Sequence, residues 1–454
     1  MISNKFRIVS LIGTSFLVLT VFRGNTQAAD LQAIASRTTE RVSVASDGSE
    51  GNGDSGGNAI SSNGRYVAFS SYASNLVSGD TNGKRDVFIH DRQTGLTERV
   101  SVASDGSQGN GDSLWEVISD YGRFVAFESY ATNLVIGDTN GRSDIFVHDR
   151  QTGLTERVSV ASDGSQENGD AEQLAISSNG RFVTFISWSS NLVSGKTTGV
   201  YDVFVHDRQT GQTERVSVAS DGSEANDNSY GLVISADGRY VAFYSNASNL
   251  VSGGTNGAAD VFLHDRQTGL TERISIASDG SQGNNYSDSP TFSADVRYVA
   301  FSSFANNLVS GDTNRKEDIF VHDRQTGLTK RVVVAFDGSQ GDGDSYWPVI
   351  SADGRYVVFA SDATNLGTWD SNGIIDIFVY DRLTGLTERI SVSSDGKESN
   401  NISARPAFSA DGCYVVFESL ANNLVSSDYN IAWDVFIHSW RQPQLLYIPM
   451  IPRD

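Results

Sequence analysis

The sequence predicts an all-β protein, a seven-bladed β-propeller of four-stranded blades, and three observations carry that prediction. A unit of 58 residues recurs along the chain without insertion or deletion. Each unit contains four short strand-like runs and no helical segment. The incomplete units at the two ends of the chain complement one another.

The repeat is defined by the phrase His-Asp-Arg-Gln-Thr-Gly. It recurs at a constant spacing of 58 residues, with its aspartate at Asp91, Asp149, Asp207, Asp265 and Asp323. The variant Tyr-Asp-Arg-Leu-Thr-Gly places Asp381 at the next step, and a degenerate seventh copy ends at Ser439. A regular repeat of this length indicates identical supersecondary units that bury their apolar faces against one another.

The four strand-like runs of the first full unit are residues 58–61, 65–71, 86–92 and 97–103. Val, Ile, Phe, Tyr and Thr dominate these runs, and apolar residues occupy both alternating faces, which is typical of sheets packed on both sides. Asn63-Gly64 is a tight-turn signal between the first two strands. Each unit therefore predicts one propeller blade.

The chain ends predict how the ring closes. Residues 39–44 have the pattern of a fourth strand with no unit before it, and residues 434–438 that of a third strand with no fourth after it. Pairing the N-terminal strand onto the last blade completes it and removes an open edge. We therefore predict one propeller domain over residues 30–440, followed by a C-terminal tail over residues 441–454.

The first 29 residues have the pattern of a secretory signal peptide. Lys5 and Arg7 precede an apolar run over residues 8–22, and small residues follow up to Ala29. This order predicts cleavage and export. We expect a secreted protein, located outside the cell, at its surface or in the periplasm, with no membrane span after the leader is removed.

Two segments carry a family resemblance. Residues 235–243, Ser-Ala-Asp-Gly-Arg-Tyr-Val-Ala-Phe, and residues 260–265, Asp-Val-Phe-Leu-His-Asp, resemble the WD40-like (PD40) repeat of TolB-type β-propellers. The resemblance covers residues 39–439 and implies a fold rather than an activity. The period is longer here, and the chain has no room for the N-terminal α/β domain of TolB, so TolB's role in envelope integrity is not implied.

Composition excludes several classes of function. The chain has 454 residues and a formal net charge of −21, which argues against a nucleic-acid or anionic-membrane partner. Its single cysteine, Cys413, excludes an internal disulfide and a Cys-based zinc site. The six histidines all occupy one repeat position, so we expect them to pack within separate blades rather than to converge on a metal.

One face of the propeller should be acidic, because the inter-blade loops and the loops between second and third strands share it. Asp80-x-Asn82-Gly83-x-x-Asp86 has the oxygen-ligand spacing of a calcium loop, although turn chemistry alone also favours these residue types. Lys196 and Gly254 replace the leading aspartate in two blades. The candidate calcium ligands are Asp80, Asn82, Asp86, Asp138, Asn140, Asp144, Asp312, Asn314, Asp318, Asp370, Asn372 and Asp376.

The least uniform repeat positions enter the innermost strand, beside the channel mouth on the acidic face. Together with aromatic departures in the last two blades, they give the candidate ligand-binding residues Trp115, Tyr230, Tyr346, Trp347, Trp369, Arg405 and Trp433. Exposed aromatics indicate a contact surface for an extracellular glycan or protein, although they could instead pack on one another. We therefore expect a binding or interaction module stabilised by Ca²⁺.

Two alternatives remain open. One is a propeller glycan hydrolase or lyase, in which Glu116, Glu172 and Asp288 would furnish an acid/base pair across the mouth. The other is a purely structural surface protein. No nucleophile elbow, phosphate-binding loop or zinc-protease motif is present in the sequence.

Overall fold

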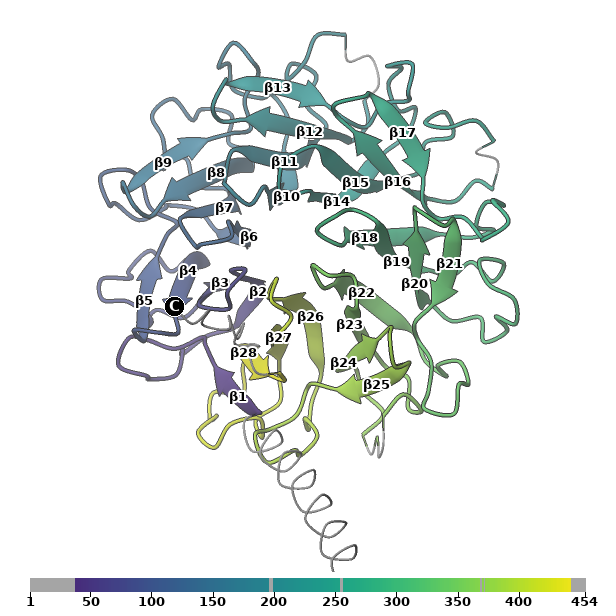
Figure 1. Cartoon of the computed structure of the whole chain (residues 1–454). Helices are drawn as coiled ribbons and strands as arrows, with labels where there is room; N and C mark the ends of the chain where they lie inside the picture. The colour runs from purple at the N-terminus through teal and green to yellow at the C-terminus, as the bar shows by residue number, and fades with distance from the viewer. Residues whose placement is uncertain (1–36, 196–198, 254–255, 368–369, 371, 442–454) are drawn as a thin grey trace, which may run out of the picture.

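A computed structural model describes residues 37–195, 199–253, 256–367, 370 and 372–441, and it confirms the seven-bladed propeller (Figure 1). Seven four-stranded antiparallel sheets surround a central channel. The described residues contain no helix, and hence none long and apolar enough to cross a bilayer. The predicted leader, and the predicted tail after Arg441, lie outside the described residues.

In each blade the strands follow one another outward from the channel, in the same order from blade to blade. The innermost strands are β2 (Ser55–Ile60), β6 (Ser113–Ile118), β10 (Ala171–Ile176), β14 (Ser229–Ile234), β18 (Ser287–Phe292), β22 (Ser345–Ile350) and β26 (Ser403–Phe408). The second strands are β3 (Tyr66–Ser71), β7 (Phe124–Ser129), β11 (Phe182–Ser187), β15 (Tyr240–Ser245), β19 (Tyr298–Ser303), β23 (Tyr356–Ser361) and β27 (Tyr414–Ser419).

The two outer strands complete each blade. The third strands are β4 (Asp86–Asp91), β8 (Asp144–Asp149), β12 (Asp202–Asp207), β16 (Asp260–Asp265), β20 (Asp318–Asp323), β24 (Asp376–Asp381) and β28 (Asp434–Ser439). The outermost strands are β5 (Leu96–Arg99), β9 (Leu154–Arg157), β13 (Gln212–Arg215), β17 (Leu270–Arg273), β21 (Leu328–Arg331), β25 (Leu386–Arg389) and β1 (Thr38–Arg41).

Three predicted strand boundaries are wrong by several residues. The innermost strand of the first blade begins at Ser55, before the predicted residue 58, and its outermost strand ends at Arg99, well before residue 103. The outer strand stops early because the chain curls into a turn, in which Val102 bridges to Gln108 instead of pairing with the blade. The N-terminal strand ends at Arg41 for the same reason, since Val44 bridges to Glu50.

The blade cores are built from the middle strands. In every blade a phenylalanine of the second strand stacks on one of the third, as for Phe69 and Phe88, whose ring centroids are 5.9 Å apart. Both rings are fully buried. Because both faces of each blade are covered by its neighbours, the middle strands are apolar on both sides, as the sequence predicted.

Closure follows the prediction. Strand β1 pairs antiparallel with β28, with Thr39 opposite His438, so the N-terminal strand completes the last blade (Figure 1). The Val42 N–H also donates to the Val435 carbonyl over 2.8 Å. This pairing gives the last blade the same four strands as the other six, so its third strand is not left as an edge.

The histidines have a structural role. His90 Nδ1 lies 2.9 Å from the Thr97 hydroxyl of the neighbouring outermost strand, and four further blades repeat this contact. In the last blade His438 contacts Thr39 of β1 in the same way, over 2.8 Å. Burial lowers the pKa of each of the six rings, which favours the neutral form.

The adjacent Asp and Arg of the repeat phrase do not pair with each other. Asp91 accepts two hydrogen bonds from Arg65 of its own blade, over 2.8 and 2.6 Å, which hold the pKa of that carboxyl well below its usual range. Arg92 instead reaches the preceding blade, where it contacts Glu40 over 2.6 Å. The phrase therefore provides one contact within the blade and one between blades.

Candidate functional site

A bulge in every innermost strand shapes the channel mouth. The register between the first and second strands shifts at the third residue of each innermost strand, for example between Gly56 and Asn58. The residues at the shift have left-handed φ values: Gly57 (59°), Trp115 (54°), Gln173 (44°), Gly231 (56°), Ser289 (48°), Trp347 (50°) and Arg405 (48°). These residues were expected at the strand entrance, but they lie within the strands.

These seven residues line one cavity of about 460 Å³ in the channel. Because each innermost strand starts from an inter-blade loop and the bulge is near its start, the cavity opens toward the acidic loop face. A left-handed conformation costs a non-glycine residue about 1 kcal/mol or more. Five of the seven positions bear this cost, and such strain is typical of functional sites.

Aromatic rings are exposed in the cavity. Trp115 is 43% exposed and Trp347 39% exposed. The guanidinium of Arg405 lies 4.7 Å from the centroid of the Trp115 ring, and the Tyr346 ring lies 5.6 Å from that of Trp347. The structure therefore brings together Trp115, Trp347 and Arg405 of the predicted ligand-binding set.

The other predicted ligand-binding residues lie elsewhere. Tyr230 is half-buried and packs between Tyr201 and Tyr244. Trp433 is partly buried in the loop before β28, where its carbonyl accepts a hydrogen bond from Ser55. Trp369 lies outside the described residues.

Sequence reasoning missed a second group of aromatics on the acidic face. They occupy the position just after the second strand and are exposed: Tyr72, Tyr130, Trp188 and Phe304. The signal was available, because four of the seven blades carry an aromatic at this one repeat position.

Glu116 is a buried carboxyl group that lines the cavity. It is only 4% exposed, and neither of its carboxylate oxygens has a hydrogen-bond partner among the described residues. Burial raises the pKa of Glu116 to about 8; the charge of Glu418 adds to this effect and that of Arg85 opposes it. The group is therefore mostly protonated at pH 7.

The other two predicted acid/base residues have partners. Glu172 accepts a hydrogen bond from the Tyr201 hydroxyl over 3.3 Å, and Asp288 accepts one from Ser302. Further buried carboxyls lie near them: burial raises the pKa of Glu128 to about 8 and that of Glu317 to about 7. Of the three predicted residues, only Glu116 has unpartnered oxygens facing the cavity.

An arginine lies between the aspartates of each predicted calcium loop. Arg99 Nη1 is 3.3 Å from Asp80 and 3.2 Å from Asp86. The side-chain oxygen of Asn82 accepts a hydrogen bond from the backbone N–H of Lys84 over 2.9 Å. The equivalent loops pair Arg157 with Asp138 and Asp144, Arg331 with Asp312 and Asp318, and Arg389 with Asp370 and Asp376, while Asn140, Asn314 and Asn372 also accept backbone N–H groups.

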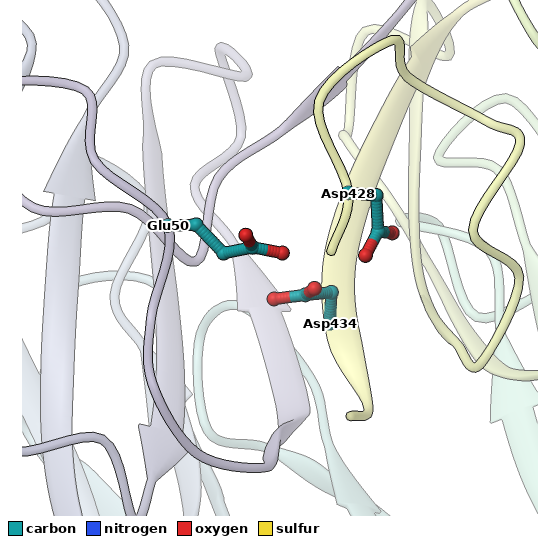
Figure 2. A group of neighbouring side chains, drawn as sticks. All are labelled: Glu50, Asp428 and Asp434. Atoms are coloured by element: carbon teal, nitrogen blue, oxygen red, sulfur yellow. The ribbon is translucent and has the colours of Figure 1, made fainter. Parts of the chain in front are cut away.

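In two of the loops between second and third strands, here called the rim loops, the two aspartates are joined by a third carboxylate. Glu50, Asp428 and Asp434 point toward one another at the junction of the last and first blades, with their nearest oxygens within 4.8 Å (Figure 2). Asp370, Asp376 and Glu398 form the equivalent group. Arg41 Nη1 contacts all three acids of the first group, at 2.6 Å from Glu50, 3.6 Å from Asp428 and 3.3 Å from Asp434. Burial raises the pKa of Asp428 and of Asp376 to about 6.

The fold and the channel site define a seven-bladed propeller with a cavity at one channel mouth. No protein-family model and no curated protein matches the chain. Its fold is similar to that of an oligogalacturonate lyase from Vibrio parahaemolyticus, at 13% identity over 88% of this chain and 93% of that chain, with a TM-score of 0.53. The β-propeller domain of the Trilobed protease from Pyrococcus furiosus is similar at 10% identity over 86% and 99% of the two chains, with a TM-score of 0.53.

The similar structures also include TolB from Acinetobacter baumannii, at 14% identity over 79% of this chain and 76% of that chain, with a TM-score of 0.39. The propeller fold that the repeat predicted is confirmed by the seven four-stranded sheets and by the two structures with a TM-score of 0.53. These identities are too low to carry an activity over to this chain. The Pyrococcus propeller is described as having an open velcro topology, whereas here β1 closes the ring.

Proposed function

We propose that the chain is an exported binding module that recognises an extracellular glycan at the channel mouth. The observation that carries this proposal is the ring of strained bulges, which presents a different side chain from each blade to one cavity. A repeat protein that keeps its blades almost identical elsewhere, yet varies the bulge positions, concentrates its specificity there.

The chemistry of the cavity suits a sugar. Exposed indole rings such as Trp115 and Trp347 stack on the C–H faces of sugar rings, which combine apolar faces with polar edges. Polar groups lie beside them: Gln173 and Ser289 line the cavity, and the buried side-chain oxygen of Asn58 has no hydrogen-bond partner among the described residues. These groups can fix the orientation of sugar hydroxyls.

Calcium is the second part of the proposal. The arginines already neutralise part of the charge in the rim loops, so we place the strongest cation binding at the two groups with three carboxylates. The first group is Glu50 with Asp428 and Asp434, and the second is Glu398 with Asp370 and Asp376. Of the two, only the second contains predicted calcium ligands, Asp370 and Asp376. Calcium there would stabilise the rim rather than contact the glycan.

The test is a glycan-array screen of the chain without its leader, run with and without EDTA. We expect a defined set of glycans to bind. We expect EDTA to lower the melting temperature of the protein while changing its glycan affinity little. A protein partner captured at the same mouth, with no glycan bound, would contradict the glycan part of the proposal.

One observation favours an enzyme, a glycan hydrolase or lyase, as a second candidate. Glu116 lines the cavity and carries a proton at neutral pH, as a general acid for glycosidic cleavage must. If this candidate holds, Glu116→Gln abolishes product formation from an array-positive glycan but leaves its binding intact. Intact glycan recovered after long incubation with the unmodified protein would exclude it.

A further inference from the structure

The first blade differs from the other six at the channel mouth. It alone has two consecutive glycines at the bulge, Gly56 and Gly57. A Cβ atom at position 57 would lie 3.2 Å from Glu116 Oε1, and one at position 56 would collide with Glu418 Oε2. The missing side chains therefore open a gap that carboxyl groups from both neighbouring blades enter.

Two cationic side chains border the same gap. Arg85 Nη2 lies 3.5 Å from where a Cβ at Gly56 would stand, and no guanidinium nitrogen of Arg85 has a hydrogen bond or ion pair among the described residues. Its guanidinium lies 5.5 Å from the centroid of the Tyr72 ring, and its charge acts on Glu116. Arg405 stacks on Trp115 and lies 3.6 Å from Glu418.

The charges in the gap do not cancel. Glu418 accepts a hydrogen bond from the Gly57 N–H over 3.0 Å. Because Glu116 is mostly protonated at pH 7, the two arginines outweigh the single carboxylate charge of Glu418. A half-buried arginine whose buried Nε has no hydrogen-bond partner among the described residues, a carboxyl group without a partner and a net positive charge all favour an anionic ligand.

Resting on the proposed function, we propose that the Gly56–Gly57 gap binds the carboxylate of an acidic sugar unit. In this arrangement Arg85 and Arg405 face the sugar carboxylate, the Glu116 hydroxyl donates a hydrogen bond to it, and the Trp115 ring supports the sugar face. Ser70 also lies near Glu116, and its hydroxyl already donates to the Gly56 carbonyl over 3.0 Å.

The mouth offers one such gap. Among the described residues, the first blade alone has two consecutive glycines at its bulge, so a second carboxylate on the next sugar would find no equivalent contact. The preferred ligand is therefore a saccharide in which one uronic acid is joined to neutral sugars, rather than a polyuronate.

The experiment uses glucuronate, glucose, acetate and a trimer of galacturonate as probes, with binding measured by NMR titration. We expect glucuronate to bind at least about tenfold more tightly than glucose and acetate, and the trimer to bind no more tightly than glucuronate. Arg85→Gln should remove the preference for glucuronate. The control Arg142→Gln, an exposed arginine paired with Asp170, should retain it.

A pH titration supplies a readout that a structural role would not move. Affinity for glucuronate should fall as the pH rises through about 8, because ionised Glu116 would repel the ligand. Glu116→Gln keeps a neutral donor at this position, so it should bind glucuronate with no such pH dependence.

The inference would be overturned if glucose or acetate bound as tightly as glucuronate. It would also be overturned if Arg85→Gln kept the preference for glucuronate over glucose. If neutral glycans bind on the array but glucuronate does not, the acidic-sugar inference fails while the proposed function stands. If no saccharide binds at all, both fail.

Discussion

Replacing Arg41 with glutamine should destabilise the propeller far more than the same change at Arg273, although both arginines occupy the same repeat position. Arg41 is buried against three carboxylates, including the fully buried Asp434. Its loss would leave these acids without a cation, and breaking a buried ion pair in this way costs about 3–5 kcal/mol.

Among the described residues, Arg273 forms an ion pair with one acid, Asp260, over 3.2 Å. After Arg273→Gln, Asp260 still accepts hydrogen bonds from Ser275 over 2.8 Å and from Gln282 over 2.7 Å. We therefore expect a loss of about 1–2 kcal/mol there, the cost of one charged hydrogen bond. Urea denaturation of both variants measures the difference.

Calcium should affect the Arg41 and Arg273 variants differently. With Arg41 removed, the oxygens of Glu50, Asp428 and Asp434 stand within 4.8 Å of one another with no guanidinium between them. Millimolar Ca²⁺ should therefore raise the melting temperature of Arg41→Gln more than that of the unmodified protein, and should leave Arg273→Gln unchanged. Equal destabilisation of the two variants, together with no calcium response, would refute the reasoning.

Three further predictions concern the bulges, the buried carboxyl groups and the closing strand β1. Ser289→Gly should raise stability by about 1 kcal/mol, because glycine removes the cost of a φ of 48°, while Gly231→Ala should lower it; melting curves of the pair test the strain argument. Raising the pH from 7 to 9 should lower the free energy of unfolding by about 1 kcal/mol for each of Glu116 and Glu128, because the folded pKa of each, about 8, lies above its unfolded value. Chemical denaturation at both pH values checks the sign, and Glu116→Gln should remove the contribution of Glu116. Deleting residues 37–44 should lower stability by several kcal/mol, since it removes β1 and the buried Val42; an unchanged melting temperature would contradict closure through β1.

The sequence was sufficient for the fold because the repeat reports the same physical pattern seven times. The apolar alternation around Phe69 and Phe88, the turn at Asn63-Gly64 and the unmatched strands at the ends each favour one closed ring. The bulges were not predictable in the same way. Only Gly57 and Gly231 hint at a left-handed conformation, whereas Trp115, Ser289 and Arg405 are residue types that normally avoid it.

The site was predicted in part, since variable repeat positions marked Trp115, Trp347 and Arg405 as neighbours of the mouth. The gap beside Gly56 was not predictable, because Glu116 and Glu418 meet only after ring closure brings the last blade against the first. The arginine in each rim loop was missed for a similar reason. Arg99 is far from Asp86 in sequence, and only the pairing of β4 with β5 brings their side chains together.

The most direct test of the account is the affinity of an array-positive glycan for the double variant Trp115→Ala, Trp347→Ala, measured by isothermal titration calorimetry. The matched control is Phe336→Ala, Tyr429→Ala, which removes two exposed aromatics that do not line the channel cavity. The account predicts at least about tenfold weaker binding for the mouth variant, with its melting temperature nearly unchanged, and full affinity for the control. Full affinity in the mouth variant, or a loss confined to the control, would contradict the claim that the channel mouth is the binding site.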